Sequence, residues 1–271
     1  MNILDQLAGH ARERVAQAKR EKPLDQLQDE ALALPRDTDF PFERALKAEG
    51  MSFICECKKA SPSKGLIAPE FPYLDIAKAY EKAGAAAISV LTEPKWFQGS
   101  DQYLNEIAST VSIPVLRKDF TVDPYMIYQA KLLGASAVLL IVALMDQEEL
   151  ASGIKLCNKL GLSALVEAHD GEQLKMAIAA GARIIGCNNR DLRDFSVDIH
   201  NSMRLRALTP DNVIFVAESG IHTPEDVKEL QDAGVDALLV GEQLMRAADP
   251  GVELRRLKGQ TASQYRGRRE P

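Results

Sequence analysis

Apolar residues along the chain occur in short runs, and most runs follow a glycine that itself follows a helix-like segment. The arrangement recurs at Gly84, Gly134, Gly161, Gly181 and Gly234. Glycine adopts the left-handed conformation at a helix end with little cost, so each glycine predicts a helix end followed by a strand. The glycines are 50, 27, 20 and 53 residues apart, and we interpret the two long intervals as double units. Each of the six units then has room for one strand, one helix and two short loops.

Three further apolar runs, residues 53–57, 113–116 and 213–217, complete the pattern. The first precedes the repeat, and the other two lie inside the double units. Together with the five glycine-marked runs they make eight strands that alternate with helices. This alternation predicts an α/β fold, a closed parallel (β/α)8 TIM barrel. An open doubly wound sheet fits less well, because no G-x-G-x-x-G sequence follows the first strand.

The helices and the chain ends follow from the same pattern. Residues 73–83 place apolar side chains largely on one side of a helix, and Thr223 followed by Pro224 predicts an N-cap with proline in the first turn. Residues 1–48 carry apolar residues at helical spacing, so we expect a helical extension that packs across one barrel mouth. We predict a single barrel domain over residues 1–257 and a polar, basic, frayed tail over residues 258–271.

The composition is that of an ordinary globular protein, with 46% hydrophobic and 27% charged residues in a chain of 271. A formal net charge of −6 argues against nucleic acid or an anionic membrane as the main partner. The four cysteines form no C-x-x-C pair, so no zinc or other metal site is expected. The N-terminal residues lack the apolar centre of an export signal, and no apolar run could span a membrane. We therefore expect a cytoplasmic location and reduced thiols.

Ionisable and amide residues stand at the ends of several predicted strands, where active sites of such barrels lie. Glu56 and Lys58 end the first strand, Lys118 the third, Glu167 the fifth and Asn188 the sixth. Because side chains alternate along a strand, Glu56 and Lys58 share the face that points into the barrel mouth. One such pair is explained equally well as an ion pair of buried charges. Charges that converge from several strands are harder to explain without a ligand or a reaction.

Lys118 and Glu167 are the candidates for proton transfer. Lys118 could pair with Asp119 instead, but alternation sends these two side chains to opposite sides of the strand. We expect burial and the nearby Lys58 to lower the pKa of Lys118, which would suit a general acid near neutral pH. Glu167, in a pocket of low dielectric constant, would accept or return a proton.

The later strand ends suggest a site for a phosphate group. Ser219-Gly220 and Gly241 allow backbone N–H groups to approach an anion, and they lie in the loops that hold phosphate in many barrels. Arg190 could add a bidentate contact. Turn geometry is the alternative explanation for these glycines. Phe97 and Phe120 lie in loops at the same mouth, where they either anchor the loops or sandwich an aromatic ring of a ligand.

Six separated motifs occur in the order typical of one enzyme family. They are ECKKASPSKG (56–65), LTEPKWFQGS (91–100), LRKDF (116–120), LVEAH (165–169), GCNNRDL (186–192) and AESGI (217–221). In these motifs the chain resembles indole-3-glycerol phosphate synthase, and the resemblance runs from the N-terminal extension to about Leu257. Any single motif would mean little, but the ordered set is specific.

The resemblance implies a lyase of tryptophan biosynthesis that needs no metal or organic cofactor. Its substrate would be 1-(2-carboxyphenylamino)-1-deoxyribulose 5-phosphate, which closes an indole ring and loses carbon dioxide and water. By motif, Lys118 would protonate the ketone oxygen, Lys58 would hold the substrate carboxylate and Glu167 would handle protons in dehydration. Further residues carried over by motif are Glu56, Asn188 and Ser219 for orientation, Gly220, Gly241 and Arg190 for the phosphate, Phe97 and Phe120 for the aromatic ring, and Ser61 for the loop near the carboxylate.

Two other functions remain open at this point. Another phosphosugar barrel enzyme, such as phosphoribosylanthranilate isomerase, would not need a lysine that holds a carboxylate, so the set of Glu56, Lys58 and Lys118 argues against it. A non-catalytic barrel that binds a phosphorylated metabolite would not need an acid and base, so Lys118 with Glu167 argues against that. The expected partner is a small phosphorylated substrate, and the expected assembly is a monomer or a weak homo-oligomer.

One departure from the family pattern follows Gly241, where Glu242-Gln243 stands in place of the small polar residues expected in many relatives. If backbone N–H groups bind the phosphate, the change matters little. If a hydroxyl makes the contact, phosphate affinity would be reduced.

Overall fold

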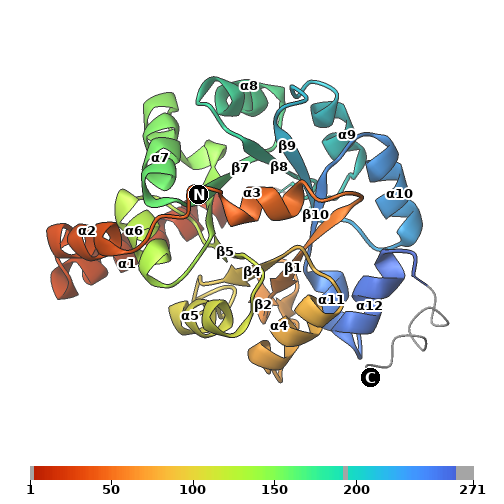
Figure 1. The fold of residues 1–271 in the computed structure, drawn as a ribbon, viewed down its shortest axis with the longest axis horizontal. Helices are drawn as coiled ribbons and strands as arrows, with labels where there is room; N and C mark the ends of the chain where they lie inside the picture. The colour runs from red at the N-terminus through yellow and green to blue at the C-terminus, as the bar shows by residue number, and fades with distance from the viewer. Residues whose placement is uncertain (1–2, 192–194, 261–271) are drawn as a thin grey trace.

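Eight parallel strands form a closed barrel in the computed structural model, which describes residues 3–191 and 195–260 (Figure 1). Neighbouring barrel strands follow the chain order, and the last strand pairs with the first. The barrel strands are β1 (Ser52–Cys57), β4 (Ala87–Leu91), β5 (Val115–Lys118), β6 (Ala137–Ile141), β7 (Ser163–Ala168), β8 (Ile184–Asn188), β9 (Ile214–Glu218) and β10 (Ala237–Val240). The prediction of a (β/α)8 TIM barrel is confirmed.

Helices connect successive strands and surround the barrel (Figure 1). They are α4 (Tyr73–Lys82), α5 (Asp101–Thr110), α6 (Pro124–Leu132), the 3-10 turn η1 (Val142–Leu144), α7 (Gln147–Leu160), α8 (Gly171–Ala179), α9 (His200–Arg206), α10 (Pro224–Asp232), α11 (Glu242–Arg246) and α12 (Pro250–Leu257). A hairpin that the sequence pattern did not predict, β2 (Ala60–Ser61) with β3 (Gly65–Leu66), lies in the loop after β1. Within the described residues, no helix has the length and apolarity needed to cross a membrane.

Two strands begin later than predicted, for identifiable reasons. The run 113–116 becomes β5 at Val115, because Pro114 has no N–H to donate to a ladder. The run 213–217 becomes β9 at Ile214, because the N–H of Val213 is used in a turn to the carbonyl of Pro210. Each of these strands also extends beyond the predicted end, so Lys118 and Glu218 belong to strands, not to the loops after them.

All five repeat glycines have positive φ angles, between 73° and 85°, as a helix end requires. At Gly161 the need for glycine is also steric, because a Cβ there would lie 2.9 Å from the backbone nitrogen and oxygen of Asp37. The glycine pattern in the sequence therefore marks the helix ends correctly.

Side chains of the strands divide into two packed layers, as alternation requires. In β1 the outward residues Phe53, Cys55 and Cys57 pack in the layer between strands and helices. Ile54 points inward and belongs to the layer that fills the barrel, together with Leu116 of β5. Burial of both faces explains why the strands are almost continuously apolar.

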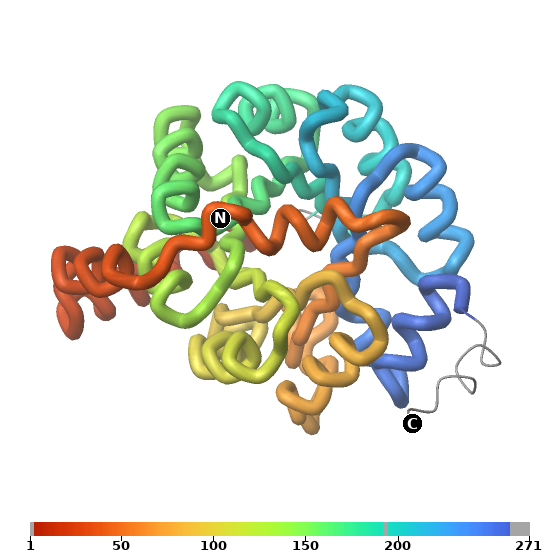
Figure 2. The backbone as a smooth tube through the Cα atoms, viewed as in Figure 1, coloured from red at the N-terminus to blue at the C-terminus, as the bar shows by residue number. Residues whose placement is uncertain are grey.

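The N-terminal extension crosses one mouth of the barrel, as expected, and its first helix also reaches the other mouth. It forms α1 (Ile3–Glu21), α2 (Leu24–Ala33) and α3 (Pro41–Leu46). Figures 1 and 2 show α3 crossing the barrel opening just before the chain enters β1. Phe42 and Leu46 of α3 are fully buried and join the interior layer. The pattern indicated helices, but it did not indicate which surface each helix would cover.

Polar contacts fix α3 at the amino-terminal mouth. Glu43 is buried and lies 2.6 Å from a guanidinium nitrogen of Arg183, next to the start of β8. The hydroxyl of Ser163, at the start of β7, also donates to Glu43. Helix α1 lies at the opposite, carboxyl-terminal mouth, where Leu7 lines the main pocket.

The predicted tail, residues 258–271, lies mostly outside the described residues. Of its described part, Lys258 donates a hydrogen bond of 2.8 Å from Nζ to the carbonyl of Gly84. This contact links the carboxyl-terminal end of α12 to the glycine just after α4.

We expect Thr223→Ala to lower the free energy of unfolding by about 1 kcal/mol. The Thr223 hydroxyl accepts from the N–H of Asp226, and the Asp226 carboxylate accepts from the N–H of Thr223, so the predicted N-cap is a complete capping box. Urea unfolding would measure the loss, and Thr223→Ser should retain most of the stability. Equal stability of the alanine variant and the parent would contradict the capping role.

Candidate active site

A pocket opens at the carboxyl-terminal mouth, and the structure brings all twelve predicted site residues to its wall. They are Glu56, Lys58, Ser61, Phe97, Lys118, Phe120, Glu167, Asn188, Arg190, Ser219, Gly220 and Gly241. They come from seven of the eight barrel-strand ends and from the loops that follow. The remaining strand, β6, is the fourth barrel strand along the chain, and it supplies only the apolar Leu139 and Ile141. The pocket therefore has an ionisable wall and an apolar wall.

Two lysines and two glutamates form the centre of the ionisable wall. Nζ of Lys58 lies 2.7 Å from Oε1 of Glu56, and Nζ of Lys118 lies 3.7 Å from Oε2 of the same carboxylate. Lys118 also lies 3.3 Å from Oε2 of Glu218. Gly241 makes room for this arrangement, because a Cβ there would lie 2.5 Å from Oε1 of Glu56. The glycine is thus required by the packing of the carboxylate.

The expected lowering of the Lys118 pKa is wrong. Burial alone would lower it, but the carboxylates of Glu218, Glu56 and Glu167 outweigh burial and raise the pKa of Lys118 well above its ordinary value. Burial likewise would raise the pKa of Glu56, yet Lys58 and Lys118 hold it below its ordinary value. Lys58, expected to repel Lys118, is instead paired with the carboxylate that both lysines share. Without substrate, Lys118 is a protonated ammonium group.

Glu218 is a site residue that the sequence interpretation left without a role. Its side chain is 1% exposed, and burial raises its pKa to about 7, while Lys118 partly opposes that rise. A Cβ at Gly186 would lie 2.4 Å from Oε1 of Glu218, so this glycine leaves room for the Glu218 carboxylate. Alternation could have found Glu218, because Val216 of the same strand points into the barrel. The sequence predicts a turn and phosphate contacts at Ser219-Gly220 and an orienting role for Ser219, but no role for Glu218.

Glu167 lies across the mouth, at the end of β7. Its side chain is 3% exposed, and Oε1 lies 3.4 Å from Nε2 of His169. Asn188, at the end of β8, accepts from the N–H of Arg190 and so orders the start of the following loop. A buried carboxylate beside an imidazole can take up and return a proton.

The turn after β9 contains two successive residues in the left-handed conformation. Ser219 and Gly220 both have positive φ, 69° and 80°. A serine held in this conformation costs about 1 kcal/mol, and such residues concentrate at binding sites. The side chain of Asn189 donates to the carbonyl of Ser219 at 3.1 Å and holds the turn from the β8 loop. Asn189 is a second residue whose supporting role the sequence did not reveal.

Glu242 lies at the same end of the pocket, among positive side chains. Its carboxylate lies 3.7 Å from Arg190, 3.6 Å from Lys64 and 3.0 Å from Nε of Arg246. Burial would raise the Glu242 pKa, but Arg246 and Lys64 hold it below its ordinary value. The Glu242 carboxylate thus pairs with three cationic side chains at this end of the pocket.

Two aromatic rings border the apolar side of the pocket. The Phe97 and Phe120 rings lie 6.0 Å apart with an interplanar angle of 39°. The carbonyl of Phe97 accepts from the N–H of Ala60, which joins the loops after β1 and β4. Rings at this separation can contact a flat aromatic ligand on its edge and face.

The described residues contain no group of three or more His, Cys, Asp or Glu side chains placed to hold a metal ion. The side chains that line the pocket include acids, bases and charged donors. Ammonium groups at one wall can stabilise negative charge that develops on a ligand oxygen, and carboxylates across the mouth can move protons.

Comparison with known proteins gives one family. A family model described as indole-3-glycerol phosphate synthase matches residues 4–257. A protein named indole-3-glycerol phosphate synthase from Ruminiclostridium cellulolyticum is 56% identical over 257 residues, covering 95% of this chain and 99% of its own. One of the same name from Lachnoclostridium phytofermentans is 49% identical over 268 residues, with 94% and 98% covered. The solved 3-hexulose-6-phosphate synthase from Salmonella typhimurium has a TM-score of 0.64 at 16% identity, covering 77% of this chain and 97% of its own, a likeness of fold alone.

Proposed function

Since the chain belongs to the indole-3-glycerol phosphate synthase family, we propose how its pocket residues divide the work of that reaction. The enzyme is a carboxy-lyase of tryptophan biosynthesis. It converts 1-(2-carboxyphenylamino)-1-deoxyribulose 5-phosphate to indole-3-glycerol phosphate, carbon dioxide and water. The observation that carries the proposal is Lys118, held as an ammonium group among Glu56, Glu167 and Glu218. The family match leaves no support for the isomerase or the non-catalytic binding barrel.

Lys118 is the general acid of ring closure in this proposal. The aromatic carbon that bears the carboxylate attacks the substrate ketone, a new carbon–carbon bond forms and the electron pair of the carbonyl moves to oxygen. A neutral aromatic carbon is a poor nucleophile, so the carbonyl must be activated by a proton or a charged hydrogen bond. The oxygen becomes an alkoxide, which is more basic than an amine, and therefore takes the proton from Lys118 in spite of its raised pKa.

Lys58 holds the substrate carboxylate until it leaves as carbon dioxide and the ring regains aromaticity. Its ammonium group already binds one carboxylate, Glu56, at 2.7 Å, and Ser61 lines the pocket next to it. Dehydration follows. The new hydroxyl accepts a proton and leaves as water, and the neighbouring carbon of the new ring, which is bound to nitrogen, loses a proton to a base. Glu167 is the proposed proton carrier in this step, and Glu218, with its pKa of about 7, is the proposed second one.

The phosphate binds at the Ser219-Gly220 turn and at Gly241, with Arg190 as a bidentate donor. Glu242 must then release Arg190, or turn away from it, when the substrate enters. We assign the contact at Gly241 to backbone N–H, because position 242 offers a carboxylate and no hydroxyl. Phe97 and Phe120 bind the anthranilate ring, while Glu56, Asn188 and Ser219 orient the reacting groups and sugar hydroxyls.

The partners and organisation belong to this proposal too. We propose one catalytic domain over residues 1–257, in the cytoplasm, as a monomer or weak homo-oligomer that binds no nucleic acid. Its net charge of −6 supports the absence of nucleic-acid binding.

We expect purified protein to convert the carboxyphenylamino-deoxyribulose phosphate to a product with indole fluorescence. The rise is measured against the constant signal of the protein's single tryptophan. Phosphoribosylanthranilate serves as the second substrate, and no conversion of it is expected. A protein that is folded by circular dichroism and gives no fluorescence rise with authentic substrate would overturn the assignment.

A further inference from the structure

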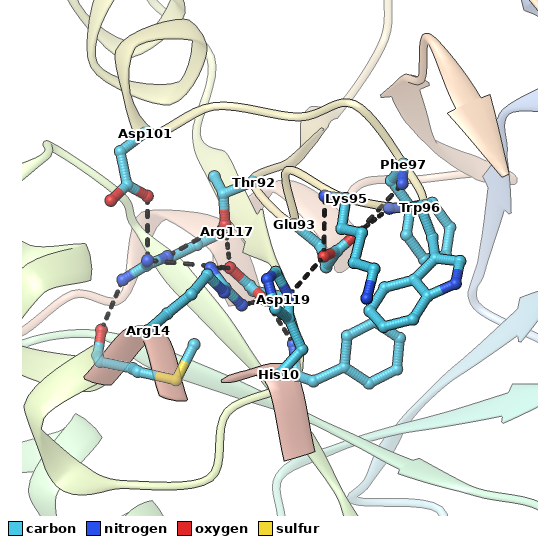
Figure 3. A network of polar contacts seen from close by, with 12 residues as sticks. His10, Arg14, Thr92, Glu93, Lys95, Trp96, Phe97, Asp101, Arg117 and Asp119 are labelled. Carbon is cyan, nitrogen blue, oxygen red and sulfur yellow. Dashed lines mark hydrogen bonds and ion pairs between the residues drawn. The ribbon is translucent and has the colours of Figure 1, made fainter. Parts of the chain in front are cut away.

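Two fully buried carboxylates, Glu93 and Asp119, lie beside the pocket and have no part in the proposed proton chemistry. Glu93 belongs to the loop after β4, and Asp119 follows Lys118 at the end of β5. Burial of two charges is costly unless each has specific partners. Figure 3 shows that their partners lie in the backbone of the aromatic loops and on helix α1.

The Glu93 carboxylate organises the loop that carries Phe97. Oε1 accepts from the N–H of Lys95 at 2.9 Å, and Oε2 accepts from the N–H groups of Trp96 and Phe97 at 2.7 and 3.0 Å. The N–H of Gly99 then bonds the carbonyl of Glu93 and closes the loop back on its start. Three charge-assisted hydrogen bonds from successive residues fix the backbone from which the Phe97 ring projects.

Asp119 does the same for the second ring. Its Oδ1 accepts from the N–H of Phe120 at 2.8 Å, and its Oδ2 accepts from the hydroxyl of Thr92 at 2.6 Å. Thr92 directly precedes Glu93, so Asp119 links the Phe120 backbone to the start of the Phe97 loop. Burial would raise the pKa of Asp119, but Arg14, Arg117 and Thr92 together hold it below its ordinary value.

Helix α1 holds both carboxylates from outside. His10 and Arg14 are one turn apart and lie on the same face of the helix. Nδ1 of His10 lies 3.1 Å from Oε1 of Glu93, and Arg14 binds both Asp119 oxygens, at 2.6 and 3.0 Å. Helix α1 therefore contacts both the loop that carries Phe97 and the loop that carries Phe120.

We propose that Glu93 and Asp119 are positioning residues that set the separation of the Phe97 and Phe120 rings, and that His10 and Arg14 of α1 hold this pair in place. The inference rests on the proposed function, because it takes the two rings as the anthranilate site. Removing either carboxylate releases one ring and weakens binding of the aromatic part of the substrate. Binding of the phosphate part, at the other end of the pocket, is unaffected.

The test compares Glu93→Gln and Asp119→Asn with the parent in three measurements. These are KM for the substrate, Kd for indole-3-glycerol phosphate, and the inhibition constant of inorganic phosphate. We expect KM and the product Kd to rise about tenfold, with kcat falling less, and the phosphate constant to stay within about twofold. Glu43→Gln is the matched control: it also removes a buried carboxylate from an ion pair, but at the opposite mouth, and should leave all three constants unchanged.

Trp96 provides a direct readout of the loop, because it is the only tryptophan and its ring meets the His10 ring edge-on at 5.4 Å. In ligand-free protein, Glu93→Gln should change the emission of Trp96, and Glu43→Gln should not. If Glu93→Gln does not fold, the partly exposed His10→Gln and Arg14→Met variants take its place, with an expected threefold or greater rise in the product Kd.

Native product affinity in folded variants would overturn the inference, as would an equal loss of phosphate affinity, since that would indicate a general collapse of the pocket. Inactivity of the parent protein on the substrate would overturn the proposed function instead, so the two failures are distinguishable.

Discussion

Replacing Lys118 by alanine is expected to lower kcat by a factor of about 10² or more, as loss of a general acid typically does. Lys118 lies 3.3 Å from Glu218 and 3.7 Å from Glu56, and these carboxylates raise its pKa and so keep it as an ammonium group. Without it, the alkoxide formed at ring closure has no charged donor at that wall. Steady-state fluorescence kinetics would measure the loss.

A change confined to KM would contradict this role, because an interaction made only in the transition state lowers kcat and kcat/KM together. Lys118→Met separates the amine from the volume of the side chain, and it should lose as much activity as the alanine variant. Near-native kcat in either variant, with the fold intact, would remove Lys118 from the mechanism.

Replacing Glu218 by glutamine is expected to raise the free energy of unfolding at pH 8. The difference between variant and parent should be up to about 3 kcal/mol more favourable to the variant at pH 8 than at pH 4.5. The folded-state pKa of Glu218 is raised from 4.5 to about 7, so the folded protein keeps a proton that the unfolded chain releases in this window. Stability from that proton is fully present below pH 4.5 and is lost as pH rises to about 7. Glutamine does not titrate and avoids the loss. Urea unfolding at several pH values would show the difference growing with pH.

Glu56→Gln is the control for this experiment. The pKa of Glu56 is lowered, so above pH 5 the residue is ionised in both the folded and the unfolded state. Its own titration therefore adds no pH dependence between pH 5 and 8, and the effect of Glu56→Gln on stability should vary less in this window than that of Glu218→Gln, because it acts only by removing one of the charges that raise the Glu218 pKa. A pH-independent difference for Glu218→Gln would contradict the raised pKa. We also expect lower activity of Glu218→Gln, because stability gained at a strained active site commonly accompanies lost function.

The barrel could be predicted from sequence because its signals are local. A glycine in the left-handed conformation ends each marked helix, and an apolar run follows within a few residues. Alternation in β1 was enough to place Glu56 inside the mouth and Cys55 outside. The carboxyl ends of the strands in a closed barrel meet at one mouth. All twelve candidate residues therefore line one pocket.

The environment of Lys118 could not be predicted in this way. The neighbour considered from sequence was Lys58, which alone would lower the Lys118 pKa. The carboxylates that reverse the effect approach from β1, β7 and β9, and their distances depend on the shape of the closed barrel. Helical spacing likewise indicated the N-terminal helices, but the burial of Phe42 inside the barrel depends on contacts with strands far along the chain.

The position of α3 has a consequence for how the chain folds as it is made. Phe42 and Leu46 precede all eight barrel strands in the chain, but the interior layer in which they are buried includes Ile184 and Ala237. Nor can β1 complete its pairing until Ala237 to Val240 have left the ribosome. The nascent chain must therefore carry α3 with its apolar side chains exposed until the later barrel strands have been made. Contacts of such high sequence separation slow folding and leave early segments open to association with other chains.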